Sequence, residues 1–142
     1  MRVYILFLCL LAINACVAPI TIDQLRSNGG HNISFEVNQP YQKVFADLLA
    51  QTRACYLNQP QVRQITVVGN RDNANKTGNI TVEEVYAMAE HDAYLVIDVL
   101  SKNEKLTNVE AYIADKRAKA ELESIKSWLS AKENKCEVKW LS

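Results

Sequence analysis

Glycine and histidine are scarce in this chain, which excludes several kinds of active site. The 142 residues include four glycines and two histidines. No serine lies in the Gly-x-Ser-x-Gly turn of the hydrolases that use it, and Gly69 and Gly78 are too far apart for a phosphate-binding loop. His31 and His91 have no metal-ligand spacing with the cysteines. The sequence therefore predicts no catalytic residue, no cofactor and no metal, so we expect a protein that is not an enzyme.

Two pairs of neighbouring titratable residues come nearest to a catalytic group. A general base needs a positioned partner within a cleft. His91-Asp92 lies where a hairpin turn is expected, and Glu83-Glu84 lies in an expected strand. Successive side chains of a strand point to opposite faces. We interpret both pairs as ordinary polar positions.

An excess of charge of either sign is also missing. The chain has 16 basic and 16 acidic residues and a formal net charge of zero. Nucleic-acid-binding proteins carry a clustered basic excess, so we expect no nucleic-acid partner. The length suits a single domain with a core of its own.

The chain has no apolar run long enough to cross a bilayer, which takes about 20 residues. The longest apolar segment begins at Val3, after Arg2, and ends at Ile13. This is the length of the hydrophobic region of a secretory signal. Residues 1–15 are therefore predicted to be a signal peptide. An ordinary signal-peptidase site fits poorly, because it would leave Ile13 at position −3 or Pro19 at position +1.

The end of this segment, Ile13-Asn14-Ala15-Cys16, resembles the lipobox of small bacterial outer-membrane lipoproteins. The resemblance implies that Cys16 is acylated, with palmitate among its acyl chains, and becomes the new N-terminus. Two or more acyl chains anchor a protein stably, whereas one binds marginally. Val17, in place of an aspartate after the cysteine, implies the outer membrane, with the domain facing the periplasm.

Two alternatives for the N-terminus stay open. In one, Cys16 only ends a plain signal peptide and the protein is secreted. In the other, the protein is a secreted eukaryotic domain, because Asn32, Asn75 and Asn79 each begin an Asn-x-Ser/Thr sequon.

Cys55 and Cys136 are the cysteines that remain, since Cys9 leaves with the signal peptide. An even pair in an exported protein predicts a disulfide. It would close a loop of about 80 residues and stabilise the fold by about 4 kcal/mol. The alternative is a pair of free, buried thiols.

Residues 16–31 lack a sustained period and end near two adjacent glycines, so we expect the lipidated cysteine and a tether there. Ile20, Ile22 and Leu25 would also allow this segment to dock on the domain as an irregular arm. Residues 32–142 are predicted to form one domain.

The pattern of the domain is that of an α+β fold. Alternation predicts strands at 32–37, 62–68, 79–89, 93–100 and 106–113, with a polar loop over 69–78 and a bulge near Glu83-Glu84. Helical spacing predicts one helix between Pro40 and Pro60 and another after Asp115. The order of strand, helix, four strands and helix predicts two layers, an antiparallel sheet of about five strands with both helices on one face.

Side chains on the second predicted helix divide into two groups. A stripe spaced by four, three and four residues is expected to face the sheet and comprises Ala118, Leu122, Ile125 and Leu129. The charged residues, Glu121 among them, are expected to face solvent.

Tyrosines on the predicted strands supply a candidate for a contact surface. If one face of the sheet stays uncovered, Tyr86, Tyr94 and Tyr112 would form a patch on it. The predicted anchor and the missing catalytic motifs lead us to expect a membrane-anchored, non-enzymatic protein that uses its sheet or its polar loop to contact a partner protein in the cell envelope. The alternative is a binding module for a small ligand or a cell-wall glycan.

Overall fold

The computed structural model describes residues 18–27, 31–58, 64–85, 91–114 and 119–130, together with Cys136. The α+β class and the order of strand, helix, four strands and helix over the domain are confirmed. A further short helix precedes them. The elements are α2 (Ile22–Ser27), β1 (His31–Val37), α3 (Tyr41–Leu57), β2 (Gln64–Asp72), β3 (Thr77–Val85), β4 (His91–Ser101), β5 (Thr107–Ile113) and α4 (Lys119–Trp128).

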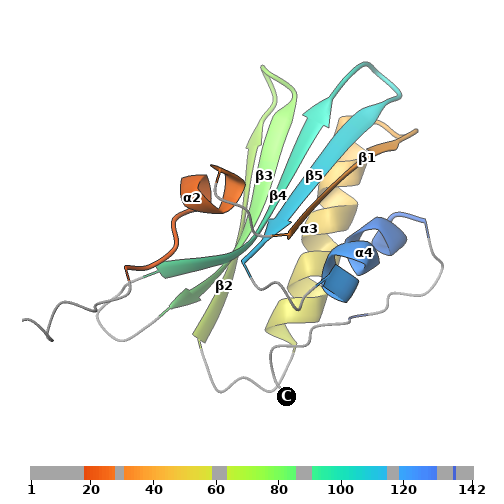
Figure 1. Ribbon diagram of the computed structural model, residues 1–142. Coiled ribbons are helices and arrows are strands. Elements are labelled where there is room, and N and C mark those ends of the chain that lie inside the picture. The colour runs from red at the N-terminus through yellow and green to blue at the C-terminus, as the bar shows by residue number, and fades with distance from the viewer. Residues whose placement is uncertain are drawn as a thin grey trace, which may run out of the picture.

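The five strands form one sheet in the order β1-β5-β4-β3-β2, and every neighbouring pair is antiparallel. β1 and β2 are the two edges, so α3 carries the chain from one edge of the sheet to the other. α3 and α4 cover one face, which we call the inner face, and α2 lies on the opposite, outer face (Figure 1). The predicted two-layer arrangement is present, with α2 added on its second side.

The main core lies between the inner face and the two long helices. Val44 and Leu48 of α3 are completely buried there, as are Ile80, Ile97 and Ala111, which lie side by side on β3, β4 and β5. Each fully buried Val, Leu or Ile side chain stabilises the fold by about 1.5–3 kcal/mol. The apolar side chains that recur at helical spacing thus pack against those that alternate along the strands, in one core layer.

Two glycines let α3 come close to the end of the sheet formed by β2 and β3. A Cβ atom added at Gly78 would lie 2.7 Å from the ring of Phe45, and one added at Gly69 would lie 2.8 Å from the methyl carbons of Leu49. Both contacts are shorter than packed carbon atoms accept. The absence of a side chain at these positions therefore sets the distance between helix and sheet.

β2 and β3 extend into the segment predicted as a polar loop. β2 continues to Asp72 and β3 begins at Thr77, so the connection between them is only residues 73–76. The carboxylate of Asp72 accepts hydrogen bonds from the backbone N–H groups of Ala74 and Asn75, and Lys76 has a positive φ of 52°. The prediction of a loop over 69–78 was wrong, because polar residues with paired backbones form a strand as long as their side chains can reach water.

A bulge interrupts the pairing of β3 with β4, where the sequence predicted one. Val82 pairs with Leu95 and Glu83 pairs with Ala93, which leaves Tyr94 as the extra residue on β4. An extra residue shifts the alternation of the strand by one position. As a result, Ala93 lies on the outer face, while Tyr94 packs against the core of the inner face.

Residues 18–27, which we call the arm, lie within the segment predicted as a tether. In the structure the arm docks on the outer face, and Leu25 is buried against Ala93 and Val96 of β4. The alternative in which Ile20, Ile22 and Leu25 pack on the domain describes this segment, in helical rather than irregular form. Cys16 and the predicted signal peptide lie outside the described residues.

Candidate functional surface

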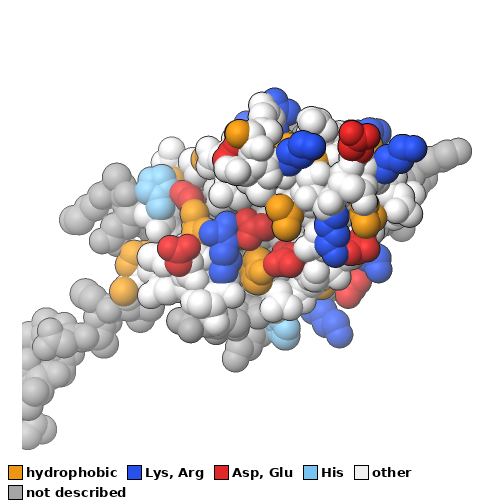
Figure 2. Space-filling view, turned by 90° about the horizontal axis from the view of Figure 1, so that it is seen from above, with side chains coloured by type: hydrophobic (Ala, Val, Ile, Leu, Met, Phe, Trp, Pro, Cys, Tyr) orange, Lys and Arg blue, Asp and Glu red, His pale blue; other side chains and the backbone are white. Residues whose placement is uncertain are grey.

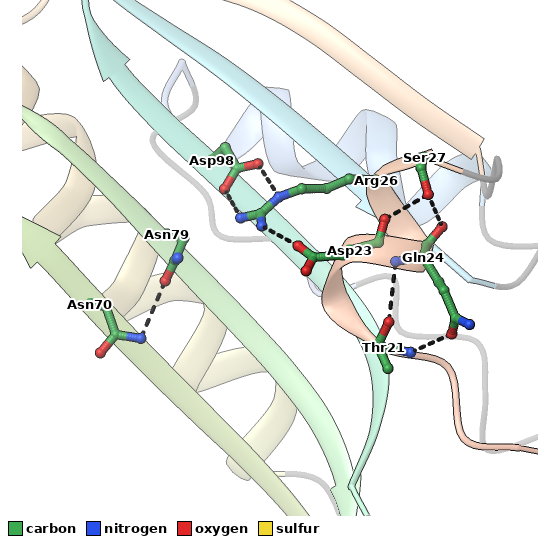
Figure 3. A network of polar contacts seen from close by, with 8 residues as sticks. All are labelled: Thr21, Asp23, Gln24, Arg26, Ser27, Asn70, Asn79 and Asp98. Carbon is green, nitrogen blue, oxygen red and sulfur yellow. Dashed lines mark hydrogen bonds and ion pairs between the residues drawn. The ribbon is translucent and has the colours of Figure 1, made fainter.

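The outer face carries a row of polar side chains that crosses all five strands. The register places Asn70 of β2 beside Asn79 of β3, Asn79 beside Asp98 of β4, Asp98 beside Glu110 of β5, and Glu110 beside Ser34 of β1. We call these five residues the polar row. Asn70 donates a hydrogen bond from its Nδ2 to Oδ1 of Asn79 at 3.3 Å (Figure 3). At neighbouring positions of the same strands, the inner face carries apolar side chains, whereas the outer face carries this polar row.

Arg26 of α2 reaches the centre of the polar row and binds Asp98 through one edge of its guanidinium group, formed by Nε and Nη2 (Figure 3). The distances are 2.8 Å from Nε to Oδ2 and 2.6 Å from Nη2 to Oδ1. The hydrogen bond to Asp98 raises the pKa of Arg26, against the opposing effect of burial. Because Asp98 and Glu110 are directly opposed carboxylates, which repel each other on neighbouring strands, this cation compensates the pair.

Glu110 is further occupied by neighbours on its own strand. The hydroxyl of Tyr112 donates to Oε2 at 2.7 Å, and Nδ2 of Asn108 donates to Oε1 at 3.0 Å. The hydrogen bond to Glu110, followed by burial, raises the pKa of Tyr112 to about 12. Tyr112 is therefore held as a neutral donor at the border between the polar row and Leu25 of the arm.

A groove of about 530 Å³ lies beside the arm, over the ends of β2, β3 and β4. Its lining includes the side chains of Arg26, Asn70, Thr77, Asn79, Asp98 and Leu100. Two large apolar residues of the outer face stay open to solvent, Val68 at 41% exposure and Leu100 at 45%. The groove thus combines two amides and an ion pair with an exposed leucine. On the side of the molecule seen in Figure 2, acidic and basic side chains are interspersed.

Two of the three tyrosines predicted to share a contact patch, Tyr94 and Tyr112, lie on opposite sides of the sheet. Tyr94 lies on the inner side, where its hydroxyl donates to Oε2 of Glu121 at 2.9 Å and its ring meets that of Tyr56 edge-on. Tyr112 lies on the outer face, and Tyr86 lies outside the described residues. The prediction of a single patch was wrong because the bulge at Tyr94 reverses the alternation on which it relied.

Glu121 is the polar residue that the sequence placed least well. It was expected in solvent, yet it is 1% exposed, and its carboxylate accepts hydrogen bonds from the hydroxyls of Tyr56 and Tyr94. Its spacing to Ile125 and Trp128, by four and then three residues, puts it on the buried side of α4. That spacing indicated a buried position, but the acidic side chain favoured the expectation that the residue faces solvent.

The residues considered for acid–base chemistry lie apart from the groove. His91 does not pair with Asp92: its Nδ1 lies 2.8 Å from Oε2 of Glu83, while Asp92 accepts a hydrogen bond from the backbone of Ile20. Glu84 is buried, and the half-buried Glu83 faces His91, in agreement with the prediction that the two point to opposite sides. The arrangement offers surface hydrogen bonds at the strand ends.

The disulfide predicted between Cys55 and Cys136 is confirmed. The two Cα atoms lie 5.3 Å apart and the sulfur atoms are bonded. Cys55 is fully buried near the end of α3, so the bond ties the C-terminal part of the chain to the core. Within the described residues, no group of three His, Cys, Asp or Glu side chains could hold a metal ion, and no helix has the length and apolarity to span a membrane.

Comparisons with known proteins find little likeness to this chain. No protein-family model matches it, and no curated protein does. Among solved structures, a norcoclaurine synthase point mutant from Thalictrum flavum in complex with a transition-state analogue is similar over 63% of this chain and 78% of its own, with 10% identity and a TM-score of 0.28. A likeness this distant leaves the function to be argued from the chain itself.

Proposed function

We propose that this chain is an exported lipoprotein that is anchored by acylated Cys16 in the outer membrane, faces the periplasm, and acts by contact with another envelope protein and without catalysis. The observation that carries the proposal is the bonded pair of Cys55 and Cys136. Structural disulfides persist in oxidising compartments outside the cytoplasm. The lipobox-like residues before Cys16 point to the same side of the membrane by an unrelated argument.

The outer face supports a role in contact. It offers the polar row, the groove and two exposed apolar side chains, Val68 and Leu100, on one side of the sheet. Interfaces between proteins combine apolar contacts of this kind with a polar, hydrogen-bonding surround. We infer that a partner protein covers β2, β3 and the adjoining part of β4.

The anchor is tested by the mass of the mature protein and by fractionation of the cell envelope. Acylated Cys16 should carry the added mass of its fatty acyl chains, and Cys16→Ser should lose this mass and leave the membrane fraction. Val17→Asp is the matched control, because it keeps Cys16 and so keeps the acyl chains. An unmodified Cys16 in the wild-type protein would remove the anchor from the proposal.

The contact role is tested by photo-crosslinking in intact cells. A crosslinking amino acid at Val68 or Leu100 should capture one envelope protein, whereas the same group at the exposed Lys43, on α3, should not. Equal capture from all three positions, or capture from none, would contradict the proposed surface.

A second candidate is the binding of a cell-wall glycan in the groove. The groove is lined by the amides of Asn70 and Asn79 and by the ion pair of Arg26 and Asp98, which are groups that hydrogen-bond sugar hydroxyls. Soluble peptidoglycan fragments should then raise the melting temperature by mass action, and Asn79→Ala should abolish the shift while Asn103→Ala keeps it. No shift in the wild-type protein would exclude this candidate.

A further inference from the structure

The arm is fixed to the outer face by contacts that extend from Ile20 to Arg26. At its start, the N–H of Ile20 donates to Oδ1 of Asp92 at 2.6 Å, and the N–H of Ala93 donates to the carbonyl of Ile20 at 2.9 Å. At its end, Arg26 makes the two hydrogen bonds to Asp98. Between them, Leu25 is 3% exposed. The arm therefore runs along β4, from the first residues of β4 to Asp98.

The arm also has an internal cap that fixes its helical shape. The N–H of Thr21 donates to Oε1 of Gln24 at 3.0 Å, and the N–H of Gln24 donates to Oγ1 of Thr21 at 3.2 Å (Figure 3). This reciprocal pair is a capping box, which satisfies two backbone donors at a helix start. The arm is thus a folded part of the domain from Ile20 onward.

Docking of the arm shortens the chain that separates Cys16 from the domain. If the free segment ran from Cys16 to His31, its fifteen residue steps could reach about 54 Å. With Ile20 held on β4, only four steps remain, and they reach about 14 Å. A lipid attached at Cys16 must then lie close to the end of the sheet at which β4 begins.

We propose that the arm holds the domain on the bilayer in one orientation, with the start of β4 at the lipid headgroups and the turns at 73–76 and 102–106 pointing into the compartment. The inference rests on the proposed acylation of Cys16. β4 has eleven residues, so its ten steps of about 3.3 Å span about 33 Å, which is the difference in height between the two ends of the sheet when β4 stands upright on the bilayer. The groove lies toward the far end of the sheet, away from the lipid headgroups.

The orientation is measurable by quenching from lipids that carry a nitroxide on the headgroup. The full chain is produced in a bacterium that processes lipoproteins and reconstituted in vesicles of phosphatidylethanolamine and phosphatidylglycerol. A fluorescent amino acid replaces Gln64, which lies at the near end of the sheet, or Asn103, at the far end. We expect strong quenching at position 64 and little at position 103. Equal quenching at the two positions would overturn the inference.

Two variants separate the effect of the arm from other causes. A flexible Gly/Ser insertion of about 15 residues between Ala18 and Pro19 leaves the arm intact but lengthens the free chain, so the difference between positions 64 and 103 should disappear. Leu25→Asp with Arg26→Ala should have the same result by releasing the arm, with thermal unfolding to show that the domain stays folded. Lys43→Ala, which removes an exposed ion pair with Asp47 on α3, should keep the difference.

The outcomes distinguish this inference from the proposed function. If the intact mass shows no acyl chain on Cys16, the proposed anchor fails and the orientation fails with it. If Cys16 is acylated but the difference between the two positions persists after the insertion, the anchor stands. The inference that the short link between Cys16 and Ile20 sets the orientation is then refuted.

Discussion

Removal of the disulfide should lower the free energy of unfolding by an amount close to the total stability of many small domains. Cys55 and Cys136 are separated by 81 positions, and in the chain-entropy model a loop of this length lowers the entropy of the unfolded chain by about 15 cal/mol/K, or about 4.5 kcal/mol at 25 °C. Cys55 is also fully buried, so Cys55→Ala removes a sulfur from the core at a further cost of about 1 kcal/mol. The sum falls within the total stability of many domains, about 5–15 kcal/mol.

Guanidinium unfolding of three samples tests this reasoning. The oxidised protein is compared with the same protein in reductant and with the Cys55→Ala/Cys136→Ala variant. The reduced protein should lie within about 1 kcal/mol of the variant, because it keeps the sulfur atoms and loses only the cross-link. An unfolding midpoint that does not move in reductant, or reactive thiols at Cys55 and Cys136 in the unfolded oxidised protein, would refute it.

Three further predictions concern single side chains. Gly78→Ala should lower the free energy of unfolding by about 1–3 kcal/mol, and more than Gly69→Ala, because the ring of Phe45 lies in the way; equal thermal stabilities would contradict this. Glu121→Ala should cost about 3 kcal/mol by removing the acceptor of the buried hydroxyl of Tyr56 and the partly buried hydroxyl of Tyr94, and Glu121→Gln less in the same assay; a cost within error would contradict it. The pKa of Tyr112, about 12, exceeds its unfolded value of about 10. Its contribution to stability is therefore complete below pH 10 and is lost as the pH rises toward 12, so the wild-type protein should lose stability over that range relative to Tyr112→Phe; parallel pH profiles would contradict this.

The layers of the fold could be predicted because they depend on local periods. On α3, Val44, Leu48, Thr52 and Cys55 recur at helical spacing, and all are buried. On β5, Val109 and the alternate residues after it are buried. A period of two or of 3.6 residues fixes which side chains share a face before any tertiary contact is known.

Features of the candidate surface depend on partners distant in sequence, which no local period records. Glu121 is buried because Tyr56, 65 positions earlier, and Tyr94 present hydroxyls to it. The bulge was expected from the phase of β3, but the extra residue lies on β4. The sequence indicated a shift in phase without indicating which strand would absorb it, and that choice decides whether Tyr94 faces a helix or a partner.

The arm gives the clearest case of a local signal outweighed by composition. A six-residue helix does not form by itself, because helix nucleation is costly. Thr21 and Gln24 have the spacing of a capping box, but two glycines follow the segment, so its composition is that of a tether. What stabilises α2 is the small side chain of Ala93, which leaves room for Leu25, and Asp98, 72 positions from Arg26. Because these contacts hold the chain from Ile20 onward, the start of the folded domain is set by the surface of β4 and not by the position of the first strand.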